Sequence, residues 1–313
     1  MIKLGIIMDP ISNINLNKDS SFAILLEAQR RQYEIHYMEL NDLFLQKGKA
    51  CARTRILNVK NDPYKWYSFF NEYVIELHEL NVIFMRKDPP LDQEFIYATY
   101  ILEHAENKGT IIINKPQSLR DCNEKIFITW FPDLIPDTLV TRNKSQILNF
   151  WRKHSDIILK PLDGMGGSSV FRITPNDVNV SVIIENLTAN GKCYCMAQEF
   201  ITEIINGDKR VFIVDGEPIP HCLARKAQGT ETRSNIAVGG IGEVQSLSVI
   251  DMQIVRRITP ILQQKGLLFV GLDIIGDKLT EINVTSPTCI REIEAASSYS
   301  ITSKLMNMIE KRL

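Results

Sequence analysis

Short apolar runs that alternate with helical segments fill the first third of the chain, and this alternation constrains the fold most strongly. The runs span residues 2–8, 33–38, 82–85 and 110–114. Each is typical of a strand that is buried on both faces. Asp19 or Ser20 can cap a helix after the first run, and a second helix is expected over about 93–107. Such alternation predicts a parallel sheet covered by helices, an α/β domain, in which the aperiodic residues 40–75 are an insertion.

The pattern changes near residue 120. Beyond it, short strand-like runs are separated by turns and only a few helices, which indicates an α+β architecture. Ser118 and Asp121 have the spacing of a capping box, so we expect a helix to start there and place the boundary near it. With 313 residues the chain has room for two domains of about 150 residues each. We expect these domains to span residues 1–122 and 123–313.

The charge balance limits the partners. The chain has 36 Lys and Arg against 37 Asp and Glu, a formal net charge of −1. It lacks the basic excess typical of proteins that bind nucleic acid or an anionic membrane, so we expect neither as a partner. The N-terminal apolar stretch is too short for a signal peptide, and no run approaches the roughly 20 apolar residues of a spanning helix. We therefore expect a cytoplasmic protein whose six cysteines are reduced.

A lysine at the end of an apolar strand precedes a glycine-rich turn. Residues 157–169 read IILKPLDGMGGSS, which places Lys160 before Gly164, Gly166 and Gly167. Glycines allow consecutive backbone N–H groups to converge on an anion, and the lysine adds positive charge beside them. The order differs from the Walker A motif, in which the lysine closes the loop and a helix follows. Two interpretations remain, a phosphate-binding loop or a glycine-rich hairpin beside a solvated lysine.

Carboxylates interrupt two apolar strands near the C-terminus. Asp273 lies in the first strand, and Glu281 and Asn283 lie in the second. Oxygen ligands of this kind suit Mg²⁺, although a solvated strand face would have the same pattern. A simple two-residue turn would put Asp273 and Glu281 on opposite faces of the sheet. If they share a metal, we expect an odd-length loop or a one-residue bulge that sets them opposite each other, facing the cleft of Lys160.

Several arginines lie at strand ends or in loops, among them Arg86, Arg210, Arg225 and Arg233. Each alone is typical of a solvated charge, but a group of them would suit an anionic substrate. Residues 226–242 form a long glycine-containing segment of little periodicity, and such loops are usually functional or disordered. The sequence contains neither H-E-x-x-H nor G-x-S-x-G, which argues against the corresponding hydrolases.

These features together resemble the ATP-grasp superfamily, and longer strings resemble its bacterial glutathione synthetases. The strings are MRKDPP (85–90), NKPQSLRDCNEK (114–125), ILKPLDGMGG (158–167), GDKRV (207–211), VDGEP (214–218), and GLDII through TEINVTSPTCIREIE (271–294). They occur in family order, and the similarity runs from Met1 to near the C-terminus. The resemblance implies an ATP-grasp fold after the N-terminal α/β domain. It also implies a ligase that joins γ-glutamylcysteine to glycine through an acyl phosphate, releasing ADP and phosphate.

The same resemblance implies roles for residues of this sequence. The ATP-binding set would be Lys125, Lys160, Gly164, Gly166, Gly167, Glu199, Ile201 and Asp208. The catalytic residues would be Arg210 and Arg225, and the substrate-binding set Arg86, Arg233, Ser286, Thr288 and Glu292. The metal ligands would be Asp273, Glu281 and Asn283, holding two Mg²⁺ or Mn²⁺ ions. Residues 226–242 would be a lid, and the assembly a homotetramer.

Departures from the family pattern fall in the lid and the adenine hinge. Thr230, Ser234 and Ile241 replace two glycines and a basic residue, which bears on lid movement rather than on the reaction. Another ATP-grasp ligase, such as D-alanine–D-alanine ligase or a ribosomal-protein glutamate ligase, would share the phosphate and metal residues. Only the substrate-side strings discriminate, and they favour glutathione. A non-catalytic, synapsin-like ATP-binding module would lack Arg210, Arg225 or a metal ligand, all of which are present.

Overall fold

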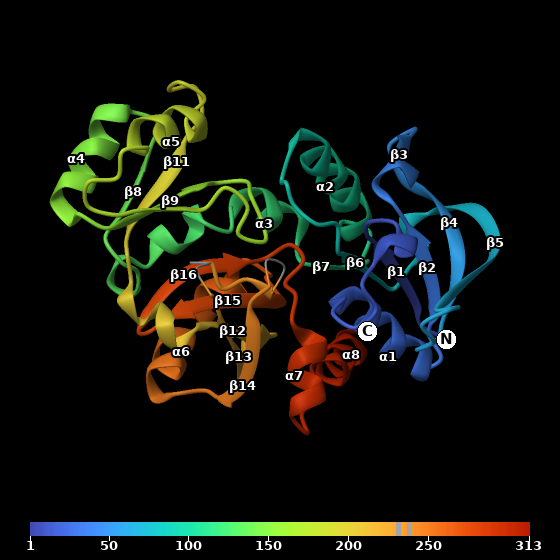
Figure 1. Cartoon of the computed structure of the whole chain (residues 1–313). Helices are drawn as coiled ribbons and strands as arrows, with labels where there is room; N and C mark the ends of the chain where they lie inside the picture. Colours follow the sequence, from blue (N-terminus) through green and yellow to red (C-terminus); the bar gives the residue numbers. More distant parts are fainter. Residues whose placement is uncertain (230–232, 237–238) are drawn as a thin grey trace.

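The computed structural model describes residues 1–229, 233–236 and 239–313, and three β-sheets organise it (Figure 1). The first sheet, in blue and cyan, lies on one side of the molecule. The second, in green and yellow, and the third, in orange and red, lie one above the other on the opposite side. Thr230 and the other residues of 230–232 and 237–238, all within the expected lid, lie outside the described residues.

The first sheet confirms the predicted α/β N-terminal domain. Its strand order is β3-β4-β2-β1-β6-β7, and β5 pairs with β4. The parallel strands are β1 (Lys3–Ile7), β2 (Glu34–Met38), β6 (Val82–Met85) and β7 (Ile111–Ile113). The connecting helices are α1 (Ser20–Arg30) and α2 (Gln93–Glu106). Asp19 caps α1, as predicted, by accepting a hydrogen bond from the Phe22 backbone N–H at 2.6 Å.

The segment 40–75 is not an aperiodic insertion, and that expectation was wrong. It forms three antiparallel strands, β3 (Leu43–Gln46), β4 (Lys49–Val59) and β5 (Tyr67–Glu76), which extend the parallel sheet. A bulge after Arg55 shifts the register of β4 and hides the alternation of its side chains. The Arg55 guanidinium lies over the rings of Tyr37 and Phe69, at 4.9 and 4.4 Å, so a charged residue here is part of the packed sheet.

Helix α3 (Pro116–Asp121) begins two residues before the capping box that the sequence indicated at Ser118. Proline is favourable in the first turn, because its missing N–H would have no helical partner there. The Ser118 hydroxyl instead donates a hydrogen bond to the Lys265 carbonyl. This helix leads into the segment that carries Glu124 and Lys125.

The second sheet is antiparallel, with the order β10-β9-β11-β8. Its strands are β8 (Thr138–Thr141), β9 (Ile157–Pro161), β10 (Phe171–Ile173) and β11 (Cys195–Glu199), and its helices are α4 (Lys144–His154) and α5 (Val180–Leu187). Apolar side chains of both helices, including Ile147, Phe150 and Ile184, form a separate core with this sheet. Lys160 extends from β9.

The third sheet is also antiparallel, with the order β14-β13-β12-β15-β16. Its strands are β12 (Asp208–Val214), β13 (Glu217–Lys226), β14 (Ile241–Ser246), β15 (Phe269–Ile275) and β16 (Lys278–Asn283), and helix α6 (Val249–Gln264) follows β14. Asp215 and Gly216 form the hairpin turn between β12 and β13, with φ of +51° and +80°. The segment 226–242 therefore starts and ends in paired strands, because Lys226 pairs with Ile241.

The end of the chain returns to the first domain. Helices α7 (Ile290–Ala296) and α8 (Ile301–Arg312) lie beside α1 in Figure 1, and Glu310 of α8 accepts hydrogen bonds from Arg31 and Tyr33. Asn114 joins the first and third sheets. Its amide donates to the carbonyls of Phe269 and Val284, both at 2.7 Å, and its oxygen accepts from the Phe269 N–H at 2.8 Å. This contact fixes the ends of β15 and β16 against the N-terminal domain.

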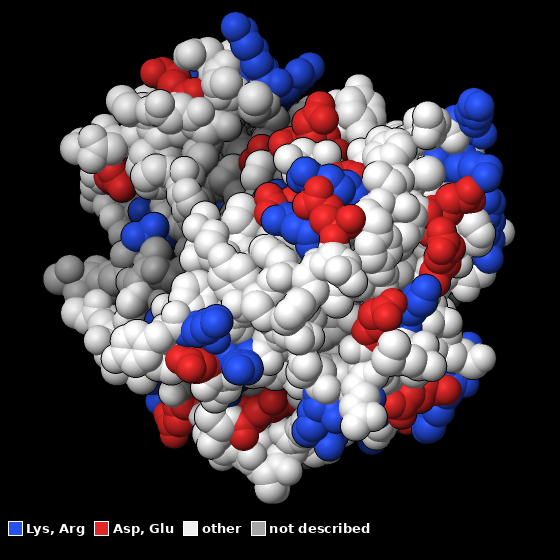
Figure 2. All heavy atoms as spheres, turned by 90° about the vertical axis from the view of Figure 1, so that its right-hand side faces the viewer, with Lys and Arg blue, Asp and Glu red and all other residues white. Residues whose placement is uncertain are grey.

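No helix within the described ranges has the length and apolar character needed to span a membrane. Figure 2 views the molecule from the side of the first sheet. Basic and acidic side chains are interspersed on this face, and neither sign forms a continuous field there.

Candidate active site

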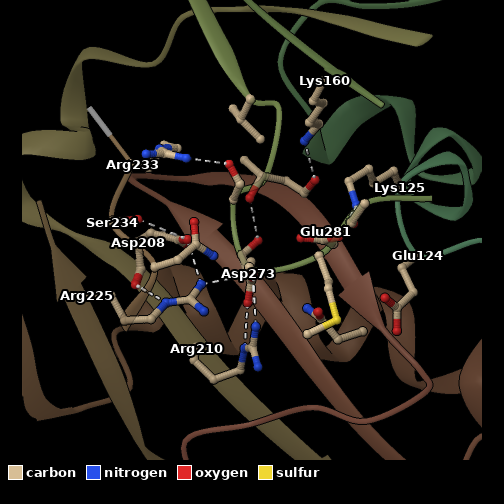
Figure 3. Close-up of a pocket in the computed structure, with 18 of the residues that line it drawn as sticks. Glu124, Lys125, Lys160, Asp208, Arg210, Arg225, Arg233, Ser234, Asp273 and Glu281 are labelled. Carbon is tan, nitrogen blue, oxygen red and sulfur yellow. Dashed lines mark hydrogen bonds and ion pairs between the residues drawn. The ribbon is translucent and has the colours of Figure 1, made fainter. Parts of the chain in front are cut away.

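A pocket of about 260 Å³ lies where the second and third sheets meet the loops after β6 and α3. Figure 3 shows lysines entering it from one side and arginines from the other. Most of the residues expected at the site line it: Lys125, Lys160, Gly164, Gly166, Gly167, Glu199, Ile201, Asp208, Arg210, Arg225, Arg233, Asp273, Glu281, Asn283, Ser286 and Thr288. The topology thus brings segments more than 100 residues apart into one cleft.

Lys160 is buried at the wall of this pocket. Its Nζ donates to the Thr280 carbonyl at 3.3 Å, and no carboxylate of the described ranges lies within 4 Å of it. Burial lowers the pKa of Lys160 to about 8, because desolvation disfavours its charged form. A buried cation without a carboxylate partner is suited to an anionic ligand.

The glycine loop follows Lys160 and has the backbone freedom that the sequence indicated. Gly166 and Gly167 adopt φ of +62° and +80°, in the left-handed region. A Cβ on Gly167 would lie 2.6 Å from Asn235 Oδ1, so a side chain there would also collide. Arg233 donates to the Gly167 carbonyl at 3.1 Å, which connects the segment after β13 to the glycine loop.

The register of β15 and β16 confirms the predicted bulge. Ile275 pairs with Lys278, so the turn has only two residues, yet Asp273 pairs with Glu281 because the register shifts between Asp273 and Ile274. Both carboxylates therefore face the pocket that contains Lys160. Asn283 lies on the same face of β16 as Glu281, two residues further on, and its amide donates to the Gly271 carbonyl at 3.2 Å.

Two arginines hold the buried carboxylates. Arg210 makes a two-point contact with Asp273 at 2.6 and 3.1 Å. Arg225 bridges Asp208 and Asp273 at 2.6 and 2.9 Å. Burial alone would raise the pKa of Asp273, but the two guanidinium groups outweigh it and hold that pKa well below its usual range. Burial raises the pKa of Asp208, which has only a share of Arg225 to offset it.

Lys125 completes the charge network on the opposite side. Its Nζ lies 2.9 Å from Glu281 Oε1 and 2.5 Å from the Gly164 carbonyl. Burial opposes the charge of Lys125, but the attraction of Glu281 is stronger and raises the pKa of Lys125. Lys125 therefore connects the glycine loop to the bulged hairpin.

The donor set fits Mg²⁺ better than a transition metal. Asp273, Glu281 and Asn283 offer hard oxygen atoms from one wall of the pocket. Within the described ranges no three Asp, Glu, His or Cys side chains gather as a metal cluster. An ion here would take its remaining ligands from water or from a substrate's phosphate oxygens, as Mg²⁺ usually does.

Arg86 and Glu292 were expected at the pocket but are not among the residues that line it. Arg86 is buried at the contact between the first and third sheets. Its guanidinium donates to Ser21 Oγ at 3.0 Å and to the Pro287 carbonyl at 3.1 Å, and its Nη1 has no partner. Glu292 lies in α7, where burial raises its pKa and Oε2 has no hydrogen bond. Both are close to pocket residues in sequence, but their side chains turn into the protein.

Sequence reasoning missed other residues of the pocket. These residues are Asp88, Glu124, Gln198, Ser234, Asn235 and Cys289. The sequence drew attention to Ser234 as a departure in the lid, but not as a residue of the site. Ser234 is buried and its hydroxyl donates to Asp208 at 3.4 Å. Asp88 accepts from the Ser286 hydroxyl at 2.6 Å, across the contact between the two domains. Their positions inside the family strings, Asp88 after Arg86 and Glu124 before Lys125, were the available signal.

Comparison with known proteins decides the family. The model of the prokaryotic glutathione synthetase N-terminal domain matches residues 2–120, and that of the prokaryotic glutathione synthetase ATP-grasp domain matches residues 124–298. The chain belongs to the prokaryotic glutathione synthetase family. Glutathione synthetases of Shigella flexneri and Escherichia coli (strain K12) are each 66% identical over 313 residues, covering 100% of this chain and 99% of the relative. The glutathione synthetase of Vibrio parahaemolyticus is 64% identical over the same length.

The matched family model and the likeness to the ATP-grasp ligase PsnB, with a TM-score of 0.66 at 15% identity, show that this glutathione synthetase family member has the ATP-grasp fold. The D-cycloserine synthetase DcsG has a TM-score of 0.67 at 13% identity, with 99% of this chain and 100% of that chain covered. D-Alanine–D-alanine ligase of Bacillus anthracis has a TM-score of 0.59 at 13% identity, covering 100% and 97%. At this identity the likeness concerns the fold alone, whereas the full-length identity favours the glutathione synthetases over the alternative ligases.

Proposed function

We propose that this pocket joins γ-glutamylcysteine to glycine at the expense of ATP, through an acyl phosphate. The observation that carries the proposal is the bulged hairpin, which sets Asp273 opposite Glu281 on the wall that also holds Lys160. Oxygen ligands, a buried lysine and two arginines in one cleft suit transfer of a phosphoryl group, whose catalysis depends on positioning and on charge neutralisation. The full-length identity to curated glutathione synthetases supports the choice of substrates.

The nucleotide fits the side of the pocket where the second sheet lies. Lys160, Lys125 and the N–H groups of the glycine loop would hold the phosphates. Glu199 and Ile201, at the end of β11 and just after it, would present backbone groups to adenine, and Asp208 would bind the ribose. Two Mg²⁺ ions, with Mn²⁺ as a substitute, would be held by Asp273, Glu281 and Asn283 and would neutralise charge on the phosphates.

The reaction then proceeds in two steps. A carboxylate oxygen of γ-glutamylcysteine attacks the γ-phosphorus of ATP, the bond to the β-phosphate oxygen breaks, and ADP forms. The glycine amine attacks the acyl phosphate carbonyl, loses a proton, and inorganic phosphate leaves as the amide forms. Arg210 and Arg225, released in part from Asp273, would stabilise the oxyanion of the tetrahedral intermediate. Exclusion of water by the segment 226–242 would protect the acyl phosphate from hydrolysis.

The acceptor side of the pocket suits the peptide and glycine. Ser286, Thr288 and Arg233 line it, whereas Arg86 and Glu292 would act only through their neighbours. We also propose the domain limits 1–122 and 123–313, a homotetrameric assembly and a cytoplasmic location. The assembly rests on family likeness, and the location on six free cysteines together with the bacterial relatives.

One assay tests the activity. ADP release is measured with γ-glutamylcysteine plus glycine, with each alone, and with D-alanine in place of both. We expect ADP in proportion to glutathione only when both substrates are present. ADP release with D-alanine and none with γ-glutamylcysteine would instead favour the D-alanine ligase alternative.

A further inference from the structure

Glu124 makes an unusual set of contacts with the chain that leaves β16. Its Oε1 accepts three hydrogen bonds, from the N–H groups of Val284 and Thr285 at 2.8 and 2.9 Å and from Thr285 Oγ1 at 2.8 Å. Its backbone carbonyl accepts a fourth, from the Ile282 N–H at 2.9 Å. No Lys, Arg or His of the described ranges lies within 4 Å of this carboxylate, so hydrogen bonds rather than an ion pair hold it.

These contacts replace a missing neighbour strand. β16 is the edge of the third sheet and pairs only with β15, so its outer N–H groups have no strand beside them. Glu124 satisfies the N–H groups of residues 282, 284 and 285, on both sides of Asn283. An unpaired buried N–H costs about 1–3 kcal/mol, so the arrangement strongly favours one position of the strand end.

The position of β16 decides which side chains reach the pocket. A slip of one residue would turn Glu281 and Asn283 away and bring Ile282 in. β16 is prone to such a slip, because a bulge already shifts its pairing beside Asp273. The next residue, Lys125, contacts Glu281 directly at 2.9 Å. Glu124 therefore holds the strand by its backbone N–H groups, and Lys125 holds it through the Glu281 side chain.

We propose that Glu124 is a positioning residue, which fixes the register of the end of β16 and thereby the oxygen atoms of Glu281 and Asn283 (Figure 3). Glu124 also lines the pocket, but the role proposed here is exerted through its hydrogen bonds to residues 282–285. This proposal depends on the proposed function in one respect: the oxygen atoms of Glu281 and Asn283 hold the metal ion. What matters is an acceptor atom at the right reach, not the negative charge.

Two substitutions separate reach from charge. Glu124→Gln keeps the length and an acceptor oxygen but removes the charge, whereas Glu124→Asp keeps the charge and shortens the side chain by one methylene. Glu94→Gln, at an exposed position in the first turn of α2, is the matched control. The readouts are Mn²⁺ affinity in the presence of a non-hydrolysable ATP analogue, amide hydrogen exchange at residues 282–285, and kcat with both substrates.

We expect Glu124→Asp to weaken Mn²⁺ binding at least tenfold, to speed exchange at Val284 and Thr285 at least tenfold and to lower kcat. Glu124→Gln should stay within threefold of the unmodified protein in Mn²⁺ affinity and in hydrogen exchange, and Glu94→Gln should do so in all three readouts. Loss of Mn²⁺ affinity in Glu124→Gln beyond threefold overturns the proposal, as does unchanged exchange and affinity in Glu124→Asp. Hydrogen exchange needs no substrate, so failure of the proposed reaction would leave this test intact.

Discussion

Replacement of Lys160 by Met should make the protein more stable while it abolishes ATP binding. Burial lowers the pKa of Lys160 from its ordinary 10.5 to about 8. Since one pKa unit corresponds to about 1.36 kcal/mol, holding this lysine protonated at neutral pH costs the folded state about 3 kcal/mol. Lys160→Met also loses the hydrogen bond to the Thr280 carbonyl, and this loss offsets about 1 kcal/mol of the gain in stability. The net gain in the free energy of unfolding is therefore about 2 kcal/mol at pH 7.

The pH dependence of the free energy of unfolding tests whether the charge of Lys160 causes this stability difference. Below about pH 8 the lysine is charged in both the folded and the unfolded chain, so the cost is fully present. Between about 8 and 10.5 the folded protein binds fewer protons than the unfolded chain, so the stability of the unmodified protein rises with pH. Lys160→Met cannot show this rise. The stability difference between the two proteins should therefore shrink as the pH approaches 10.5.

Urea denaturation without ligands, at several pH values from 7 to 10, measures this difference, and calorimetry with ATP and Mg²⁺ measures binding. Lys192→Met, at an exposed lysine, is the control and should change neither. A Lys160→Met protein that is equally or less stable at pH 7, or whose stability difference does not vary with pH, would refute the reasoning. Retained ATP affinity would remove Lys160 from the phosphate site.

Three further predictions follow from the same contacts. Asp273→Asn should lose activity and about 3 kcal/mol of stability, because it leaves the buried Arg210 guanidinium without a carboxylate. Urea denaturation measures this loss, with the exposed turn variant Asp277→Asn as the control. Equal stability of the two variants would contradict the prediction. Asn114→Ala should lower the free energy of unfolding by about 3 kcal/mol by removing three buried hydrogen bonds, and a loss under 1 kcal/mol in the same measurement would show that the domain contact does not depend on them. Phosphorus NMR of the reaction should show ADP and inorganic phosphate, whereas stoichiometric AMP would exclude the acyl phosphate route.

The parts of the fold that were predicted correctly are those in which apolar residues follow one regular pattern along the chain. The parallel strands and α1 were found because apolar runs and the Asp19 cap are local signals. Strand β4 was missed because the bulge after Arg55, where it pairs with β5, breaks the alternation that defines a strand. The start of α3 was misplaced because two helix-start signals, Pro116 and Ser118, lie two residues apart, and the Ser118 hydroxyl bonds to the distant Lys265 carbonyl instead of capping a helix.

The candidate site was predictable where the argument used strand geometry. The requirement that Asp273 and Glu281 share a face predicted a register shift, and the shift is present. Glu292 came only from family likeness, and Arg86 from family likeness and its place at a strand end. Neither lines the pocket, because lining depends on side-chain direction and not on position in a motif. The hydrogen bonds of Glu124 connect residues about 160 positions apart, so no local pattern could indicate them.

The charge balance of the pocket connects its stability to its ligands. Among the described residues that line it, Lys and Arg number five and Asp and Glu six, so the site is close to neutral before any ligand binds. A triphosphate alone would bring a large negative charge into a poorly solvated space beside Asp273 and Glu281, which is unfavourable. The same triphosphate bound together with divalent cations adds little net charge. Those cations can bind the carboxylates that are paired with Arg210, Arg225 and Lys125 in the absence of ligands. The three basic side chains then become available for the phosphates and the oxyanion, so metal entry and arginine release are expected to be one event. Until the cations arrive, the ion pairs with Arg210 and Arg225 hold the pKa of Asp273 low and keep this carboxylate ionised.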